Sequence, residues 1–189
     1  ANLTGPDIIK KIALPEGQTR LVDVGGGHGA FTVQFCQVYP DLSATIIDSE
    51  SALETARLHT VGAGLDERIT LLPGDLWTMD WEGPYDVALL FNLLHHWDIP
   101  TNKKLLEKAR AALKPGGRVA ILDQVEGQIS GPATNAFVRL IALMYHLFAD
   151  GRVFSQEQLN DLLADSGFSD IRSHNLTKAP GNKLITAVA

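Results

Sequence analysis

The stretch LVDVGGGHGAFT, from Leu21 to Thr32, decides the fold of this chain. An apolar run that contains Asp23 leads into a glycine-rich loop, and apolar residues at helical spacing follow the loop. This order predicts a buried strand, a tight loop and a helix. Gly25, Gly27 and Gly29 permit backbone conformations that a side chain would forbid, so a ligand can approach the main chain closely. Because the loop opens onto a helix N-terminus, which favours negative charge, the stretch predicts a site for a nucleotide-like cofactor.

The glycines alone do not distinguish NAD from S-adenosylmethionine, because Gly25, Gly27 and Ala30 also satisfy the dinucleotide fingerprint. Asp23 favours S-adenosylmethionine, since a carboxylate just before the loop suits a ligand that carries an ammonium and a sulfonium. A pyrophosphate would gain nothing from this acid. A glycine-rich turn without a ligand is the remaining alternative, and the strand–loop–helix context argues against it.

The composition sets limits on the class of protein. A chain of 189 residues with 45% hydrophobic and 20% charged residues is typical of one globular domain, which we expect to span residues 1–189. The formal net charge of -6 argues against a nucleic-acid partner. A single cysteine excludes an internal disulfide and a multi-cysteine zinc site. The sequence has no signal peptide and no apolar run long enough for a membrane span, so we expect a cytoplasmic protein without a membrane partner.

A second acid closes the next predicted strand. The strand from Ala44 to Ile47 ends at Asp48, which is followed by Ser49. In an open α/β sheet an acid at this place meets the ribose diol of a nucleotide cofactor. The alternative is that Asp48 caps the next helix, although Ser51 and Glu54 form a capping-box pattern there.

A third acid follows the strand from Ile69 to Leu72, in the segment Gly74, Asp75 and Leu76. By itself Gly-Asp is only a turn signal. Its weight comes from its position, one strand after Asp48.

The fourth strand brings in residues that carry chemistry. Tyr85 to Phe91 is almost wholly apolar, as expected of a central parallel strand, and it runs out into Asn92 and His95. The fifth strand, from Arg118 to Leu122, ends at Asp123. Because neighbouring parallel strands present their carboxyl ends at one edge, we expect His95 and Asp123 to converge beside the cofactor.

A histidine held by a carboxylate suits proton removal from a phenol. A phenolic hydroxyl with a pKa of about 10 is only ~0.1% ionised at pH 7, a deficit of roughly 4 kcal/mol. General-base catalysis contributes typically about 10²- to 10⁴-fold, which covers much of that deficit. An aliphatic alcohol is a harder case, and a carboxylate acceptor needs no base.

Three stretches carry a family resemblance that covers essentially the whole chain. The glycine loop resembles motif I of the class I S-adenosylmethionine-dependent methyltransferases. The string NLLHHW at 92–97, with ADGRVFSQEQLNDLLADSGF at 149–168, resembles the catalytic domain of caffeic acid/hydroxyindole-type small-molecule O-methyltransferases. The resemblance implies a Rossmann-like α/β fold: a seven-stranded, mostly parallel sheet with a final antiparallel strand and helices on both faces.

The resemblance also implies roles for single residues. His95 falls at the catalytic base and Asp123 at the acid that orients it, in an enzyme that methylates a small aromatic hydroxyl compound, yields S-adenosylhomocysteine and needs no metal. Asp75 falls at the position that accepts from the adenine amino group. The expected cofactor contacts are Asp23, Gly25, Gly27, Asp48, Ser49, Gly74, Asp75, Leu76 and Asn92.

The chain departs from the family pattern in two places. Val153 stands about where plant members carry a second acid beside the histidine, and the family's N-terminal dimerisation domain is absent from this chain. Other methyltransferases carry a histidine here without catalytic duty. Methylation of a carbon, nitrogen or carboxylate acceptor, or cofactor binding without transfer, therefore remain open alternatives. We expect His96 to face away from His95, since adjacent side chains diverge.

The stretch from Ala133 to Phe148 predicts a helix that is apolar almost all round, too short to span a membrane. It is either a core helix or a lid over the acceptor pocket that packs against a second subunit or the missing domain. We favour the lid, because such a sheet has little room to bury this helix. It implies a possible homodimer, and Phe137, Met144 and Tyr145 would suit a flat aromatic acceptor.

The last part of the chain completes the predicted sheet. Ser155 and Gln158 form a capping box at the start of a helix. Ile171 to Leu176 and Leu184 to Val188 are two strands joined by a short connection, which predicts an antiparallel pair.

Overall fold

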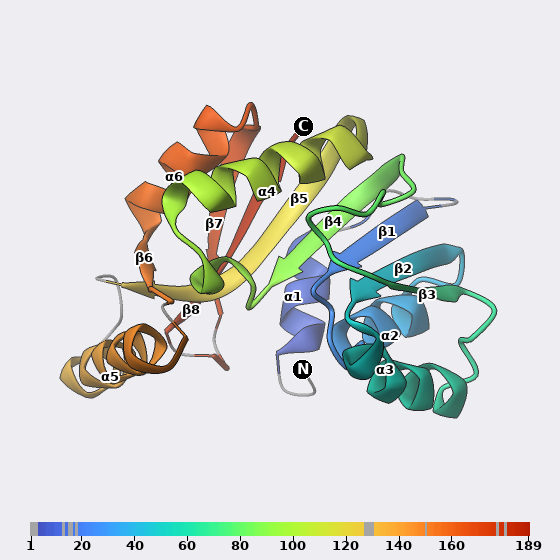
Figure 1. The fold of residues 1–189 in the computed structure, drawn as a ribbon, viewed down its shortest axis with the longest axis horizontal. Coiled ribbons are helices and arrows are strands. Elements are labelled where there is room, and N and C mark those ends of the chain that lie inside the picture. Colours follow the sequence, from blue (N-terminus) through green and yellow to red (C-terminus); the bar gives the residue numbers. More distant parts are fainter. Residues whose placement is uncertain are drawn as a thin grey trace.

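A computed structural model describes residues 4–12, 14, 17, 19–126, 131–149, 151–176, 178–179 and 181–189. It has one twisted sheet between two layers of helices (Figure 1). The strands are β1 Thr19–Val24, β2 Leu42–Asp48, β3 Ile69–Pro73, β4 Tyr85–Phe91, β5 Leu113–Glu126, β6 Phe154–Ser155, β7 Ser169–Asn175 and β8 Asn182–Val188. The helices are α1 Gly5–Ile12, α2 Ala30–Val38, α3 Glu50–Gly62, α4 Ile99–Ala112, α5 Pro132–Ala149 and α6 Gln156–Asp165, with a short 3₁₀ turn η1 at Leu94–His96.

The sheet has the predicted α/β architecture. Its strand order is β3-β2-β1-β4-β5-β8-β7, and the two-residue strand β6 pairs with β5 outside this path. The strands β1 to β5 pair in parallel, whereas β8 is antiparallel to both β5 and β7. The prediction of a final antiparallel strand is therefore confirmed. The order reverses between β1 and β4, which puts the carboxyl ends of both strands at the edge where open α/β sheets bind ligands.

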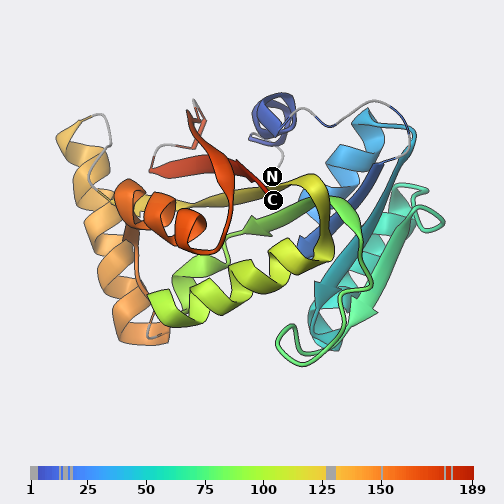
Figure 2. The same ribbon diagram turned by 90° about the horizontal axis from the view of Figure 1, so that it is seen from above.

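Apolar side chains on both faces of the sheet hold the helices. One core cluster joins the sheet to α4 and α6, and the other joins it to α1, α2 and α3, so the two groups cover opposite faces (Figure 2). The central strand β4 is buried along almost its whole length, as its continuous apolar sequence predicts. These buried strands form a rigid base for the loops at their carboxyl ends.

Two helix starts tested the capping predictions. The capping box of Ser155 and Gln158 at α6 is confirmed, with both of its hydrogen bonds present. The predicted box of Ser51 and Glu54 at α3 is wrong, because the helix begins earlier. Ser49 is its N-cap and accepts from the N–H of Ala52. A serine two positions upstream offers the same chemistry, and local pattern alone does not choose between the two.

The helix α5 lies at one end of the sheet (Figure 1). Val138 is buried against the rest of the chain, but much of the apolar surface of α5 is open to solvent. Its large exposed side chains are Phe137, Leu140, Leu143, Met144 and Leu147, each about half exposed or more, from 49% to 64%. The alternative of a core helix buried within this chain is therefore wrong. The side chain of Phe148 lies outside the described residues. No described helix meets the length and hydropathy required to cross a lipid bilayer.

Candidate active site

The glycine loop adopts backbone conformations that require glycine. Gly25 has φ 67° and Gly27 has φ 54°, both in the left-handed region. A Cβ at Gly25 would come within 2.6 Å of Cδ1 of Leu93. The N–H of Gly25 donates to the carbonyl of Ile47 (2.8 Å), which ties the loop to the end of β2.

Asp48 holds the same loop with its side chain. Its Oδ2 accepts from the N–H of Gly27 (2.8 Å), and its Oδ1 accepts from the N–H of Ser49 (2.7 Å). A carboxylate has about four lone-pair positions, so two remain for a ligand. The main-chain carbonyl of Asp48 accepts from the N–H of Gly74 (3.0 Å), which links the ends of β2 and β3. Hydrogen bonds thus connect the glycine loop, Asp48 and the segment that contains Asp75 along one edge of the sheet.

Asp23 is a buried acid with a raised pKa. It is only 2% exposed, and its Oδ2 accepts from the hydroxyl of Thr32 (2.6 Å). Burial raises its pKa to about 6; the Thr32 bond opposes this shift and the charge of Asp48 adds to it. Asp23 lines a cavity of about 370 Å³ with Gly25, Gly26, Gly27, His28, Phe31, Ala52, Thr55, Phe91 and Asn92. A cation in this cavity would stabilise the ionised form of Asp23.

The predicted adenine segment lies outside the lining of that cavity. Asp75 is exposed, and its Oδ1 accepts from the N–H of Trp77 (2.9 Å). No pattern in the sequence points to the residue that holds this segment in place, Lys108. Its Nζ donates to the carbonyls of Leu76 (2.7 Å), Trp77 (3.0 Å) and Met79 (2.7 Å). Lys108 comes from α4, so only the tertiary fold reveals the contact.

His95 and Asp123 converge as predicted. They are 6% and 2% exposed, and Nδ1 of His95 lies 3.0 Å from Oδ1 of Asp123. The main-chain N–H of His95 donates to the other carboxylate oxygen (3.2 Å). This arrangement favours a proton on Nδ1, which leaves Nε2 as the basic nitrogen of a neutral imidazole. The pair can therefore accept a proton at Nε2, with Asp123 stabilising the imidazolium that results.

The prediction that His96 faces away from His95 is wrong. Their ring centroids are 4.3 Å apart, because both residues lie in the 3₁₀ turn η1 and not on a strand. Among the described residues, no group of three or more His, Cys, Asp or Glu side chains could hold a metal ion.

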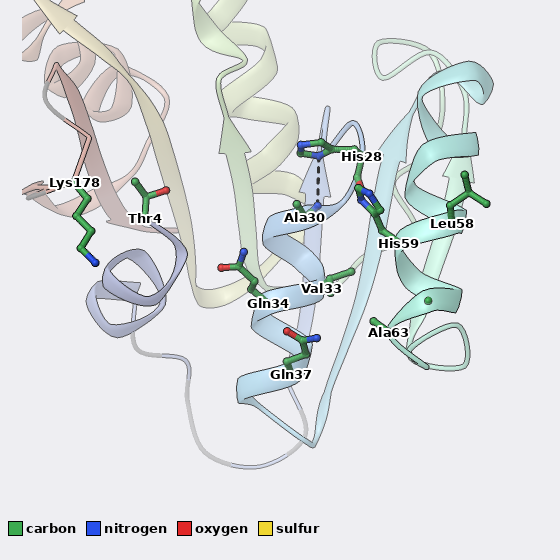
Figure 3. Close-up of a pocket in the computed structure, with 11 residues that line it drawn as sticks. Thr4, His28, Ala30, Val33, Gln34, Gln37, Leu58, His59, Ala63 and Lys178 are labelled. Atoms are coloured by element: carbon green, nitrogen blue, oxygen red, sulfur yellow. Dashed lines mark hydrogen bonds between the residues drawn. The ribbon is translucent and has the colours of Figure 1, made fainter. Parts of the chain in front are cut away.

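A larger groove of about 940 Å³ lies elsewhere on the molecule (Figure 3). Its lining comes from α2, α3, the residue before α1, and Lys178. His28 borders both this groove and the 370 Å³ cavity, and neither His95 nor Asp123 lines either of them. We assign the candidate site to the smaller cavity because Asp23, the glycine loop and Asn92 line it, at the carboxyl ends of β1 and β4.

Comparison with protein-family models identifies residues 1–169 as an O-methyltransferase domain. The chain belongs to this family. The matched residues include the glycine loop, the acids Asp23, Asp48 and Asp75, and both members of the His95–Asp123 pair. The family assignment confirms the resemblance expected from the sequence.

Two relatives carry methyltransferase names, and a third is named for a different activity, hydroxylation. The 3-hydroxy-5-methyl-1-naphthoate 3-O-methyltransferase of Streptomyces sahachiroi is 30% identical over 189 residues, which are 100% of this chain and 54% of that protein. The crystal structure of human N-acetylserotonin methyltransferase with S-adenosylmethionine has a TM-score of 0.82 and 25% identity, covering 97% of this chain and 51% of that one. The aclacinomycin 10-hydroxylase RdmB of Streptomyces purpurascens is 31% identical over 149 residues, 79% of this chain and 39% of that protein. The chain thus spans about half the length of its relatives, or less.

Proposed function

We propose that this chain is the catalytic domain of an S-adenosylmethionine-dependent methyltransferase that methylates the hydroxyl of a small aromatic compound. The observation that carries the proposal is the buried His95–Asp123 pair. It lies at the same edge of the sheet as the glycine-loop cavity, where the parallel strands have their carboxyl ends. The family assignment and the naphthoate O-methyltransferase relative support it. This is the function implied by the sequence resemblance.

The residues around the cavity fit S-adenosylmethionine. A buried carboxylate with a raised pKa, Asp23, would be stabilised by the ammonium of the cofactor. The free lone pairs of Asp48 suit the two ribose hydroxyls, and the absence of a side chain at Gly25 leaves room for close approach. When bound, the cofactor supplies an electrophilic methyl group on a sulfonium.

The remaining predicted contacts are proposed in the same way. Asp75 keeps Oδ2 free of the bond that Oδ1 makes with Trp77, and we assign it the adenine amino group, with Leu76 against the ring. Gly27 and Asn92 border the cavity directly. The N–H of Ser49 donates to the side-chain Oδ1 of Asp48, and the N–H of Gly74 donates to its main-chain carbonyl. The contact of these two residues with the cofactor stays a prediction.

The proposed chemical role of His95 is that of a general base. With S-adenosylmethionine bound, Nε2 would take the proton of the acceptor hydroxyl, so that the oxygen could receive the methyl group while the sulfur–methyl bond breaks and S-adenosylhomocysteine leaves. Asp123, on the opposite side of the ring, keeps the proton on Nδ1 and stabilises the imidazolium. Alignment of acceptor and methyl group supplies much of the remaining rate.

The apolar face of α5 supports a proposal about assembly. Among the described side chains of α5, five large apolar ones are exposed, and the relatives are about twice as long as this chain. We assign this face to contact with a second subunit or with a further domain of the full-length protein. Light scattering on the full-length protein and on its Leu140→Asp variant tests the assignment. An oligomeric state and a stability unchanged by the variant would refute it. The cytoplasmic location stays a prediction from the sequence.

The activity is tested with the full-length protein and S-adenosylmethionine labelled on the methyl group. The acceptors are 3-hydroxy-5-methyl-1-naphthoate and N-acetylserotonin, taken from the names of the relatives. We expect label in the product, and a loss of about 10²- to 10⁴-fold for His95→Gln. The matched control is His174→Gln on β7, where the substituted side chain can keep a hydrogen bond to Thr186.

The outcomes separate the alternatives. Normal transfer by His95→Gln would refute the general base and favour an acceptor that needs none, such as a carboxylate. Heat of cofactor binding without transfer to any phenol would indicate a binding domain without methylation. No heat with S-adenosylmethionine or S-adenosylhomocysteine would refute the proposed function as a whole.

A further inference from the structure

A ring from α5 covers the imidazole of His95. The ring of Tyr145 lies parallel to that of His95, with an interplanar angle of 5° and centroids 4.2 Å apart. Tyr145 is partly buried, in contrast to the neighbouring exposed side chains of α5. The sequence suggested this residue as a flat surface for the acceptor, but one face of its ring is occupied by His95.

Main-chain hydrogen bonds connect α5, residues 151–152 and the turn η1. The N–H of Arg152 donates to the carbonyl of His95 (2.9 Å), and the N–H of Gly151 donates to the carbonyl of Tyr145 (3.0 Å). A Cβ at Gly151 would lie 2.5 Å from the carbonyl oxygen of His95, so only glycine fits there. The end of α5 is thus fastened to the turn that carries His95.

These contacts fix different degrees of freedom of the imidazole. The bond from Nδ1 to Asp123 holds one edge of the ring, and the plane of the ring can still tilt about the Cβ–Cγ bond within the range that this hydrogen bond tolerates. A parallel ring against its face opposes this rotation. The His96 ring also lies close, with its centroid 4.3 Å away and its plane tilted by 42°, so the parallel contact with Tyr145 acts beside it and the Asp123 bond in restricting the direction in which Nε2 points.

We propose that Tyr145 is a positioning residue, whose ring holds the plane of His95 so that Nε2 faces the acceptor hydroxyl. The inference rests on the proposed role of His95 as a base. Tyr145 acts through its ring and not as a second base: burial and the charge of Asp123 raise the pKa of its hydroxyl, so the hydroxyl keeps its proton at neutral pH. A methyl-transfer site with one carboxylate on the histidine thus gains its second constraint from an aromatic ring.

The test compares Tyr145→Leu, which removes the ring, with Tyr145→Phe, which keeps it, in the full-length protein. The control is His146→Leu, the same new side chain on the next, exposed residue of α5. One readout is the NMR signal of the His95 ring, assigned by its loss in His95→Gln. The other is the single-turnover rate of transfer to 3-hydroxy-5-methyl-1-naphthoate, with calorimetry of S-adenosylmethionine binding.

We expect the ring current of Tyr145 to shift the His95 signal upfield in the wild type and in Tyr145→Phe, and this shift to vanish in Tyr145→Leu. The transfer rate should fall about threefold to tenfold in Tyr145→Leu and return in Tyr145→Phe, with cofactor affinity unchanged throughout. His146→Leu should match the wild type in every readout.

Three results would overturn the inference: a His95 signal unmoved by Tyr145→Leu, a wild-type rate in that variant, or a rate in Tyr145→Phe as low as in Tyr145→Leu. Failure of the proposed function is recognised separately. A His95→Gln variant with full activity refutes the base, and a wild-type protein that binds S-adenosylmethionine without transfer to any phenol indicates a binding domain. A slow His95→Gln variant beside a fast Tyr145→Leu variant refutes only the positioning role.

Discussion

The substitution Asp23→Asn should stabilise the protein without cofactor at neutral pH. Asp23 is almost fully buried, and its pKa is raised from 3.8 to about 6 chiefly by that burial. At about 1.36 kcal/mol per pKa unit, ionised Asp23 destabilises the folded state by about 3 kcal/mol. Asparagine has nearly the same shape, carries no charge and can still accept from Thr32.

The sign of this effect depends on pH. Because the folded pKa of Asp23 is higher than the unfolded one, the wild type is destabilised fully above about pH 6. The difference falls to about half at pH 5 and to well under about 1 kcal/mol at pH 4, where the carboxyl is largely protonated in both states. The gain from Asp23→Asn should therefore grow from pH 4 to pH 7.

Urea unfolding of the full-length protein at pH 5 and pH 8 measures this gain. Asp86→Asn is the control with the opposite sign. Burial raises the pKa of Asp86, but hydrogen bonds from Lys114 and from the N–H of Arg20 together outweigh burial and lower it. The free energy of unfolding of Asp86→Asn should therefore fall below that of the wild type by the same amount at pH 5 and at pH 8. A loss of stability in Asp23→Asn at pH 8, or a gain equal at pH 5 and pH 8, would refute the reasoning.

The same buried acid predicts proton release on cofactor binding. An ammonium beside Asp23 lowers its pKa, so at pH 6 part of the protein should lose a proton as S-adenosylmethionine binds. Calorimetry in two buffers of different ionisation enthalpy measures the number of protons. Asp23→Asn should bind more weakly and release none; equal release in both proteins would show that another group is responsible.

Three further predictions concern single contacts. Gly25→Ala should strain a left-handed residue by about 1–2 kcal/mol and abolish most cofactor affinity in calorimetry, since its Cβ meets Leu93; unchanged affinity would refute the close approach. Lys108→Met should lower the unfolding free energy by about 1.5–3 kcal/mol and weaken cofactor binding, because three carbonyls lose their donor; stability equal to the wild type would contradict this. Ser155→Ala should lower the Tm by about 2–4 °C through loss of about 1 kcal/mol of capping, while transfer activity remains; scanning calorimetry decides it.

Sequence reasoning succeeded where local chemistry decides the structure. The glycines at 25 and 27 have the left-handed φ values that their residue type permits, and Ser155 and Gln158 cap each other across one helical turn. The meeting of His95 and Asp123 followed from one topological rule, that β4 and β5 are parallel neighbours. Each of these inferences needs only the residues themselves or the order of the strands.

The features that sequence reasoning missed depend on distant segments. Lys108, on α4, donates to the carbonyl of Leu76, which lies 32 residues earlier in the sequence. The stacking of Tyr145 on His95 depends on how α5 is placed relative to η1. The apolar pattern of α5 predicted burial, but burial needs a partner surface that the described part of this chain does not supply. Periodicity describes a helix face and contains no information about what covers it.

The bond between Asp48 and the N–H of Gly27 has a consequence for how a ligand enters. The carboxylate proposed to receive the ribose already holds the loop in shape, so little conformational entropy is lost when the cofactor arrives. Exchanging Asp48 to alter nucleotide preference would therefore also loosen the loop. Selectivity at the sugar and rigidity of the binding surface are combined in one side chain, and neither can evolve independently of the other.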